Sequence, residues 1–196
     1  MVSRHSVALT LILVTWAFGS AICGQQGPGP IIKVRSYDQA GAGSSVIEKA
    51  QRRVSFVFKQ VGITAQWVAD EHPRFRILVV QNIDARFAED MFGYTPRDAD
   101  GTSSGVVYVR YGAIDSFARL TEPGRPRLNV SDVLGYCMAH EIGHLLLLAG
   151  FHSSTGIMSA RWRENDFKLI ATGGLVFSDE EGRRMREAAA RLAHFD

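Results

Sequence analysis

The spacing of apolar positions in the first half of the chain predicts a strand, a helix and two more strands. Residues 31–37 (IIKVRSY) form a short strand-like run. Across residues 44–60, apolar side chains recur every three or four positions, which predicts an amphipathic helix ending at Gly62. Residues 63–68 and 75–80 are rich in β-branched and apolar residues and predict two strands, the second of them buried.

The pattern then changes from strand-like to helical. In residues 106–111, Val107, Val109 and Tyr111 alternate with Val106, Tyr108 and Arg110. Such alternation is typical of a strand near a sheet edge. Residues 115–128 contain two prolines and a glycine and are expected to form a loop. Ser131 is a candidate N-cap for a helix that runs through Leu148 and is apolar on nearly every side.

After this helix we expect a loop over residues 150–174 and one more helix. Ser178 and Glu181 have the spacing of a capping box, so the last helix is expected to open there and to run to about His194. The arginines of this helix stand among glutamates and predict a solvated charged face. The order of elements predicts an α+β fold: a mixed, twisted β-sheet packed on two long helices, with a small C-terminal subdomain ending in a helix.

The N-terminus has the features of a signal peptide. Arg4 and His5 precede an apolar run over residues 7–18, followed by small residues. The run is shorter than the roughly 20 residues that span a bilayer. We therefore expect a signal peptide at 1–24, a single domain at 25–196, and a secreted or periplasmic protein without a membrane span in the mature chain. Lipid attachment through Cys23 is the alternative, although Ile22 before it fits that signal poorly.

Composition adds two limits. The 196 residues, 46% hydrophobic and 21% charged, are typical of one soluble globular domain. A net charge of +2 gives no reason to expect a nucleic-acid partner, and oligomeric state leaves no trace in the sequence. If Cys23 leaves with the signal peptide, Cys137 has no disulfide partner and is expected to be a small buried residue.

The apolar helix contains His140, Glu141 and His144. Residues four apart share one face of a helix, so both imidazoles can reach one ion, and Glu141 stands beside it without filling a ligand position. Zn²⁺ favours imidazole nitrogens, and a catalytic site takes three protein ligands. Within so apolar a helix, two imidazoles and a carboxylate would be costly unless paired or coordinated.

Two residues compete for the third ligand position. His152 follows Gly150, which can turn the chain back toward the histidine pair. Glu164 lies further on, in a polar segment without a clear helical pattern, and ranks second. The turn with Asp98 and Asp100 lacks the third spaced carboxylate of a calcium loop, so we interpret it as solvated.

Together with Gly150, His152 and Met158, the helix motif resembles the metzincin zinc peptidases, whose pattern is HExxHxxGxxH followed by a methionine turn. Ser153 directly follows His152, and a serine after the third histidine is typical of the matrixin branch, which the motif resembles most. His152 stands eight positions after His144 (144 to 152) where the family has six, and Leu147 occupies the family's glycine position. Either the helix continues further than in the family or the turn bulges.

The resemblance implies an exported zinc peptidase with a zincin-like fold, and the expected type is an endopeptidase. Zn²⁺ would be held by His140, His144 and His152, and Glu141 would be the general base toward a zinc-activated water. Met158 would form the floor of the site, and residues 90–94 would be the edge strand that pairs with a peptide or protein substrate. The alternatives are a zincin with a glutamate ligand, a hydrolase of non-peptide amides, or a zinc-binding module without catalysis.

Overall fold

The computed structural model describes residues 29–69, 73–82, 92–120, 126–147 and 150–193. The predicted signal peptide and Cys23 lie outside the described residues. The elements in chain order are β1 (Ile31–Asp38), α1 (Ser44–Gln60), β2 (Thr64–Trp67), β3 (Phe75–Val80), β4 (Gly93–Tyr94), β5 (Val106–Arg110), α2 (Tyr111–Arg119), α3 (Val130–Leu147), α4 (Glu164–Thr172) and α5 (Asp179–Ala193). Among the described residues, no helix is both long and apolar enough to cross a bilayer.

The strands form one mixed sheet in the order β2-β1-β3-β5-β4. β1 pairs in parallel with β2 and β3, and β3 pairs in parallel with β5. β4 is antiparallel to β5 and lies at the edge of the sheet. Burial alternates along β3 and β5, so only one face of the sheet is fully covered.

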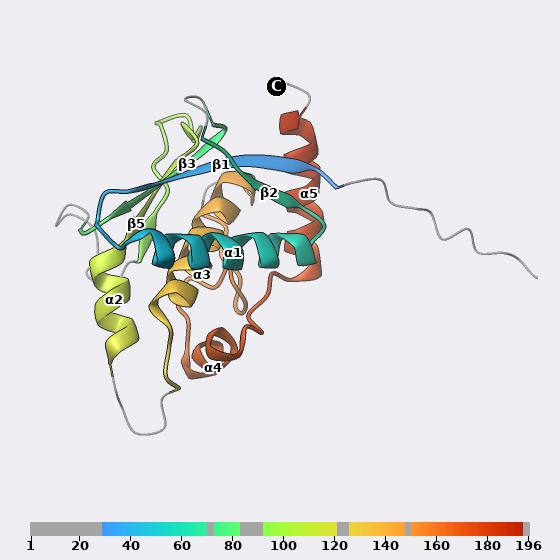
Figure 1. The fold of residues 1–196 in the computed structure, drawn as a ribbon. Coiled ribbons are helices and arrows are strands. Elements are labelled where there is room, and N and C mark those ends of the chain that lie inside the picture. Colours follow the sequence, from blue (N-terminus) through green and yellow to red (C-terminus); the bar gives the residue numbers. More distant parts are fainter. Residues whose placement is uncertain (1–28, 70–72, 83–91, 121–125, 148–149, 194–196) are drawn as a thin grey trace, which may run out of the picture.

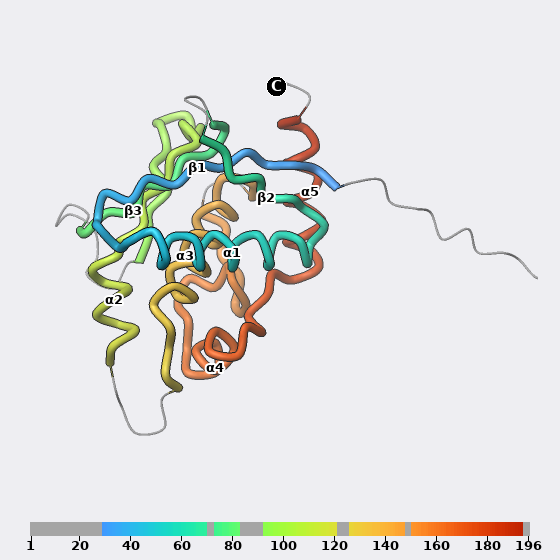
Figure 2. The backbone as a smooth tube through the Cα atoms, viewed as in Figure 1, coloured from blue at the N-terminus to red at the C-terminus, as the bar shows by residue number. Residues whose placement is uncertain are grey.

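Two long helices cover that face. α1 and α3 pack closely on each other below the sheet, and α4 lies beneath them in the view of Figures 1 and 2. The apolar side chains of α1 follow one stripe, whereas α3 is buried around most of its circumference. α5 packs against α3 and contacts β1. α3 is therefore the central helix, and groups on its inward side lie away from water.

The predicted fold class is confirmed: a mixed sheet packs on two long helices, and the chain ends in a further helix. The helix at Ser44–Gln60 and the strand at Phe75–Val80 have the predicted bounds. Gly62 has a φ of 74°, in the left-handed region expected of a helix stop. Cys137 is buried, as predicted.

Three local predictions were wrong. The expected loop at 115–128 begins within a helix, α2, which already starts at Tyr111. The expected loop at 150–174 contains α4, which Asp166 caps by accepting a 2.8 Å hydrogen bond from the Arg163 backbone. Helix α3 begins at Val130, and its N-cap is Asn129 instead of the predicted Ser131. The Asn129 side chain accepts a 3.0 Å hydrogen bond from the backbone N–H of Ser131.

Candidate metal centre

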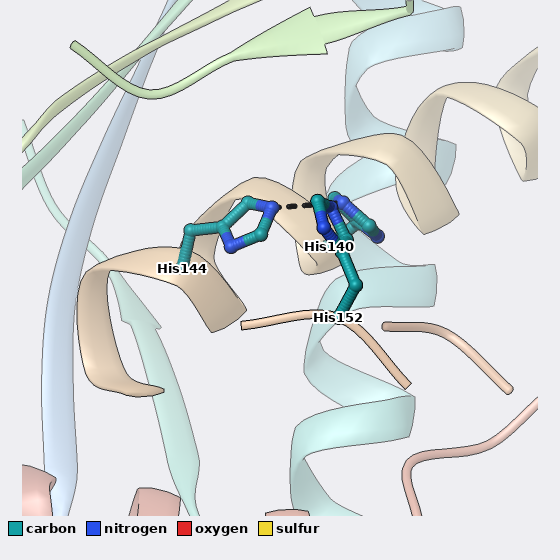
Figure 3. A group of neighbouring side chains, drawn as sticks. All are labelled: His140, His144 and His152. Atoms are coloured by element: carbon teal, nitrogen blue, oxygen red, sulfur yellow. Dashed lines mark hydrogen bonds between the residues drawn. The ribbon is translucent and has the colours of Figure 1, made fainter. Parts of the chain in front are cut away.

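Three histidines from two segments converge beneath the sheet edge. His140 and His144 lie one turn apart on α3, and His152 follows in the segment after that helix, as Figure 3 shows. One nitrogen from each ring can be chosen so that all three atoms lie within 4.8 Å of one another. The structure thus brings together the three residues that the sequence predicts as ligands.

The spacing of these nitrogens suits an ion of zinc's size. The Nε2 atoms of His140 and His144 are 3.0 Å apart. A tetrahedral ion with bonds of about 2.0–2.1 Å separates its donors by about 3.3–3.4 Å. This value lies between the 3.0 Å of the His140–His144 pair and the 4.8 Å within which all three nitrogens lie. The Nδ1 atom of His144 is buried and has no hydrogen-bond partner among the described residues. The donor set of three imidazoles is one that catalytic zinc sites use, with the fourth position left open.

The imidazole of His140 is oriented by the backbone below it. Its Nδ1 atom lies 2.7 Å from the carbonyl oxygen of Ile157, and Trp162 Nε1 donates to the same oxygen at 3.3 Å. Because a carbonyl only accepts, His140 Nδ1 carries the proton and Nε2 keeps its lone pair. An outer hydrogen bond of this kind fixes both ring orientation and tautomer at metal sites.

Burial keeps the histidines uncharged. Desolvation lowers the pKa of His140 to about 4. Desolvation, followed by the nearby His140, His152 and Arg97, lowers the pKa of His144 to about 3. Desolvation also lowers the pKa of His152. At neutral pH all three rings are therefore neutral, as metal coordination requires.

Glu141 lies beside this cluster, in a pocket formed by the edge strand. Its side chain is buried, and Thr95 Oγ1 donates a 2.6 Å hydrogen bond to Oε2. Burial raises the pKa of Glu141 to about 7, against the opposing effect of the Thr95 hydrogen bond. A Cβ atom on Gly93 would lie 2.4 Å from Glu141 Oε1. The strand therefore approaches the carboxylate at a distance that only glycine allows.

A cleft of about 1250 Å³ opens onto the histidines and Glu141. Its walls come from β4 and the residues after it, from α2, from α3, and from residues 150–167. Of the segment 90–94, predicted as the substrate-binding edge, residues 92–94 are described; they line this cleft, and β4 is the edge strand. Residues 90 and 91 lie outside the described residues.

Met158 lies directly beneath the helix motif. It is fully buried, and a Cβ atom on Gly143 would lie 2.3 Å from its sulfur atom. The methionine therefore packs against α3 between the two histidine positions, and its role as the floor of a metal site stays a prediction. α3 continues through Leu147, and Gly150 has a φ of 71°. The continuation of α3 through Leu147 is the first of the two alternatives expected from the eight-position spacing between His144 and His152.

The competing residues lie elsewhere. Glu164 begins α4, has a largely exposed side chain and pairs with Lys168 at 2.8 Å, so it is not a member of the histidine group. Asp98 and Asp100 accept hydrogen bonds from Thr102 in an exposed turn. Sequence reasoning missed Thr95, which contacts Glu141 across 46 positions. It also missed Trp162, which donates to the same Ile157 carbonyl as His140 but belongs to no recognisable motif.

Comparisons with known proteins bear on the fold. No protein-family model and no curated protein sequence matches the chain. Among solved structures, the crystal structure of a zinc-dependent peptidase from Methanocorpusculum labreanum (strain Z) is similar, with a TM-score of 0.52 and 12% identity over 78% of this chain and 99% of that chain. The structure of myroilysin matches with a TM-score of 0.37 and 14% identity over 79% of this chain and 72% of that chain, too low a score to support an argument. The chain therefore shares the fold of a zinc-dependent peptidase, and its three clustered histidines could bind a metal ion.

Proposed function

We propose that this protein is an exported zinc peptidase of metzincin type, most similar to the matrixins, and that it cleaves within peptide chains. The observation that carries the proposal is the convergence of His140, His144 and His152 beside the buried carboxylate of Glu141, in one cleft. Export follows from the N-terminal signal pattern. The three histidines would hold the zinc ion.

When bound, zinc would lower the pKa of a water molecule and stabilise negative charge on the substrate's carbonyl oxygen. Glu141 would accept a proton from the attacking water and deliver it to the leaving amine. The Thr95 hydroxyl already occupies Oε2, so we assign the proton transfer to Oε1. Thr95 and Gly93 together hold this carboxylate at the edge of the histidine cluster.

Two features favour a peptide over a small amide as the substrate. The cleft, at about 1250 Å³, exceeds the roughly 300–1,000 Å³ typical of small-molecule sites. The edge strand β4 lines it, and an extended peptide can add to an exposed strand through main-chain hydrogen bonds. A binding module without catalysis is less favoured because metal binding alone does not require Glu141.

The test compares wild-type protein with Glu141→Gln, each incubated with a denatured protein substrate. We expect the wild type to cleave internal bonds, and chelation to abolish cleavage until zinc is restored. Loss of the general base should lower the rate by about 10²–10⁴-fold. The variant should bind zinc as the wild type does, because Glu141 is not a ligand.

The pattern of results separates the alternatives. Zinc binding without cleavage, equal in wild type and Glu141→Gln, would indicate a binding module. Cleavage of small amides but not of peptides would indicate the other hydrolase class. Cleavage that persists after complete chelation would contradict the proposal altogether.

A further inference from the structure

The segment that carries His152 contacts α5 on both sides of the histidine. Ser153 Oγ donates a hydrogen bond to Glu181 Oε1. The Arg184 guanidinium lies 4.6 Å from the centre of the Phe151 ring. Glu181 and Arg184 are three positions apart, so they share one face of α5. Two neighbouring side chains of one helix thus contact the two residues that flank the third histidine.

The backbone conformation explains why this arrangement matters for His152. Ser153 forms a parallel bridge with Ser159, and its N–H donates to the Met158 carbonyl at 2.9 Å. In an extended chain, successive side chains point to opposite sides. Phe151 and Ser153 are half-buried, whereas His152 between them is exposed. When its two neighbours face α5, His152 must face the other way, toward His140 and His144.

The Glu181 carboxylate is itself fixed, independently of the histidine segment. Its side chain is 1% exposed. Oε2 accepts a 2.7 Å hydrogen bond from the Ser178 backbone, and the Glu181 N–H donates to Ser178 Oγ at 3.3 Å. This is the capping box of α5. Because α5 packs on α3, which carries the other two histidines, the Glu181 carboxylate links the position of His152 to the positions of His140 and His144.

We propose that Glu181 and Arg184 are positioning residues of the metal centre. By holding Ser153 and Phe151 against α5, they turn His152 toward the other two ligands. The capping-box glutamate therefore has a second role beyond capping the start of α5. This inference rests on the metal site of the proposed function, but it does not depend on peptide cleavage.

The experiment measures zinc affinity by competition with a chelator, and the absorption spectrum of the cobalt-substituted protein. The variants are Ser153→Ala and Glu181→Gln, with Arg184→Met for the second contact. Loss of an outer hydrogen bond at a metal site typically weakens metal binding by about 10–100-fold. We expect Ser153→Ala to show a loss in this range and an altered cobalt spectrum, and Ser153→Thr, which keeps the hydroxyl, to restore both.

Matched controls separate positioning from stability. Ser178→Ala removes the other hydroxyl of the capping box, but leaves the Ser178 backbone and Ser153 bonds to Glu181 in place. Arg183→Met alters the neighbouring arginine, which pairs with exposed Glu180 and Glu187. Both controls should keep wild-type zinc affinity and cobalt spectrum, even where the melting temperature falls.

Each outcome decides the inference. Reduced affinity in Ser153→Ala and Arg184→Met, with normal affinity in the two controls, supports it. Wild-type affinity in Ser153→Ala and Glu181→Gln, or an equal loss in Ser178→Ala, overturns it while leaving the proposed function intact. A wild-type protein that binds no zinc overturns the proposed function as well, and the two failures are thereby distinguished.

Discussion

Glu141 illustrates how closely a single side chain is constrained in this site. Its backbone belongs to the most buried helix, its Oε2 atom accepts the Thr95 hydroxyl, and the backbone of Gly93 lies against its Oε1 atom. A carboxylate with so few alternative positions is preorganised for proton transfer, and its rotamer need not be selected when substrate binds.

Gly93→Ala tests this constraint. The added Cβ atom would lie within 2.7 Å of three atoms of the Glu141 side chain, so the carboxylate or the edge strand must move. Because misplacement of about 1 Å can cost about 10²-fold in rate, we expect a comparable fall in kcat for peptide cleavage. Zinc affinity, measured on the same samples, should be unchanged. A variant with wild-type kcat would show that the carboxylate position is not critical.

The sequence identifies some of these residues and not others, for a physical reason. His140, Glu141 and His144 are readable because their relation is local: helical geometry alone places them together. His152 can be predicted as the third ligand because it lies only eight positions after His144 and just past the turn at Gly150. Thr95 and Glu181 lie 46 and 28 positions from the residues that they contact, and only the tertiary fold brings them near. Thr95 has no neighbouring pattern that marks it, and the capping-box spacing that marks Glu181 predicts the start of a helix but not the contact with Ser153.

At the scale of elements, the approach of α1 to α3 sets the position of the whole motif. Gly135 lies five positions before His140, where the motif begins (135 to 140). It faces α1 so closely that a Cβ atom would lie 2.6 Å from the Arg53 Cβ and 2.8 Å from the Ala50 carbonyl oxygen. Next to this contact, Arg53 pairs with Asp132 at 2.8 Å and joins the same two helices. The glycine and the ion pair together define the helix register.

Gly135→Ala should therefore destabilise the protein, although alanine is the better helix former. Overpacking typically costs about 1–3 kcal/mol, while the change in helix propensity returns about 1 kcal/mol. The clashing atoms belong to a backbone carbonyl and a Cβ, which cannot move aside as a flexible side chain can. We expect a net loss of up to about 2 kcal/mol in the free energy of unfolding, measured with urea. A variant more stable than the wild type would contradict the close approach.

The two helices missing from the sequence prediction depend on contacts between elements. α2 has no side-chain cap, and prolines follow close after it, so its local signals are weak. Phe117 of α2 packs edge-on against Phe92 and against Phe167 of α4, with ring centres 5.0 Å apart in both pairs. α4 does carry local signals, the Asp166 cap and the left-handed Gly173, which the polar composition around them obscured.

At the scale of the whole molecule, the fold places ionisable groups where only neutral forms are favoured. The histidine cluster is assembled from α3 and a later segment, and the sheet edge covers its carboxylate. In the absence of a metal ion, such a site makes stability depend on pH.

Metal-free protein should become less stable as the pH falls below 6.5. His140 and His144 have folded pKa values of about 4 and about 3, below the ordinary 6.5, so the unfolded chain binds more protons as the pH falls below 6.5. Stability should be lost over this range, by up to about 1.4 kcal/mol per pH unit for each histidine. Glu141, with a raised pKa of about 7, acts in the opposite direction between pH 7 and 4.5 and partly offsets the loss.

Urea unfolding of chelator-treated protein at pH 7 and pH 5 measures the effect, and a His140→Gln/His144→Gln double variant isolates it. Because Glu141 is present in both proteins, its contribution largely cancels in the comparison. We expect the wild type to lose more stability than the double variant on acidification. Equal losses would mean that the two rings are not buried in the neutral form.

The proposed metal centre requires that three histidines share one ion. Crystals of zinc-loaded protein, measured on both sides of the zinc absorption edge, test it directly. We predict one strong anomalous peak about 2.0–2.1 Å from a ring nitrogen of each of His140, His144 and His152. A peak held by other residues, or by only two of these histidines, would contradict the proposed metal centre.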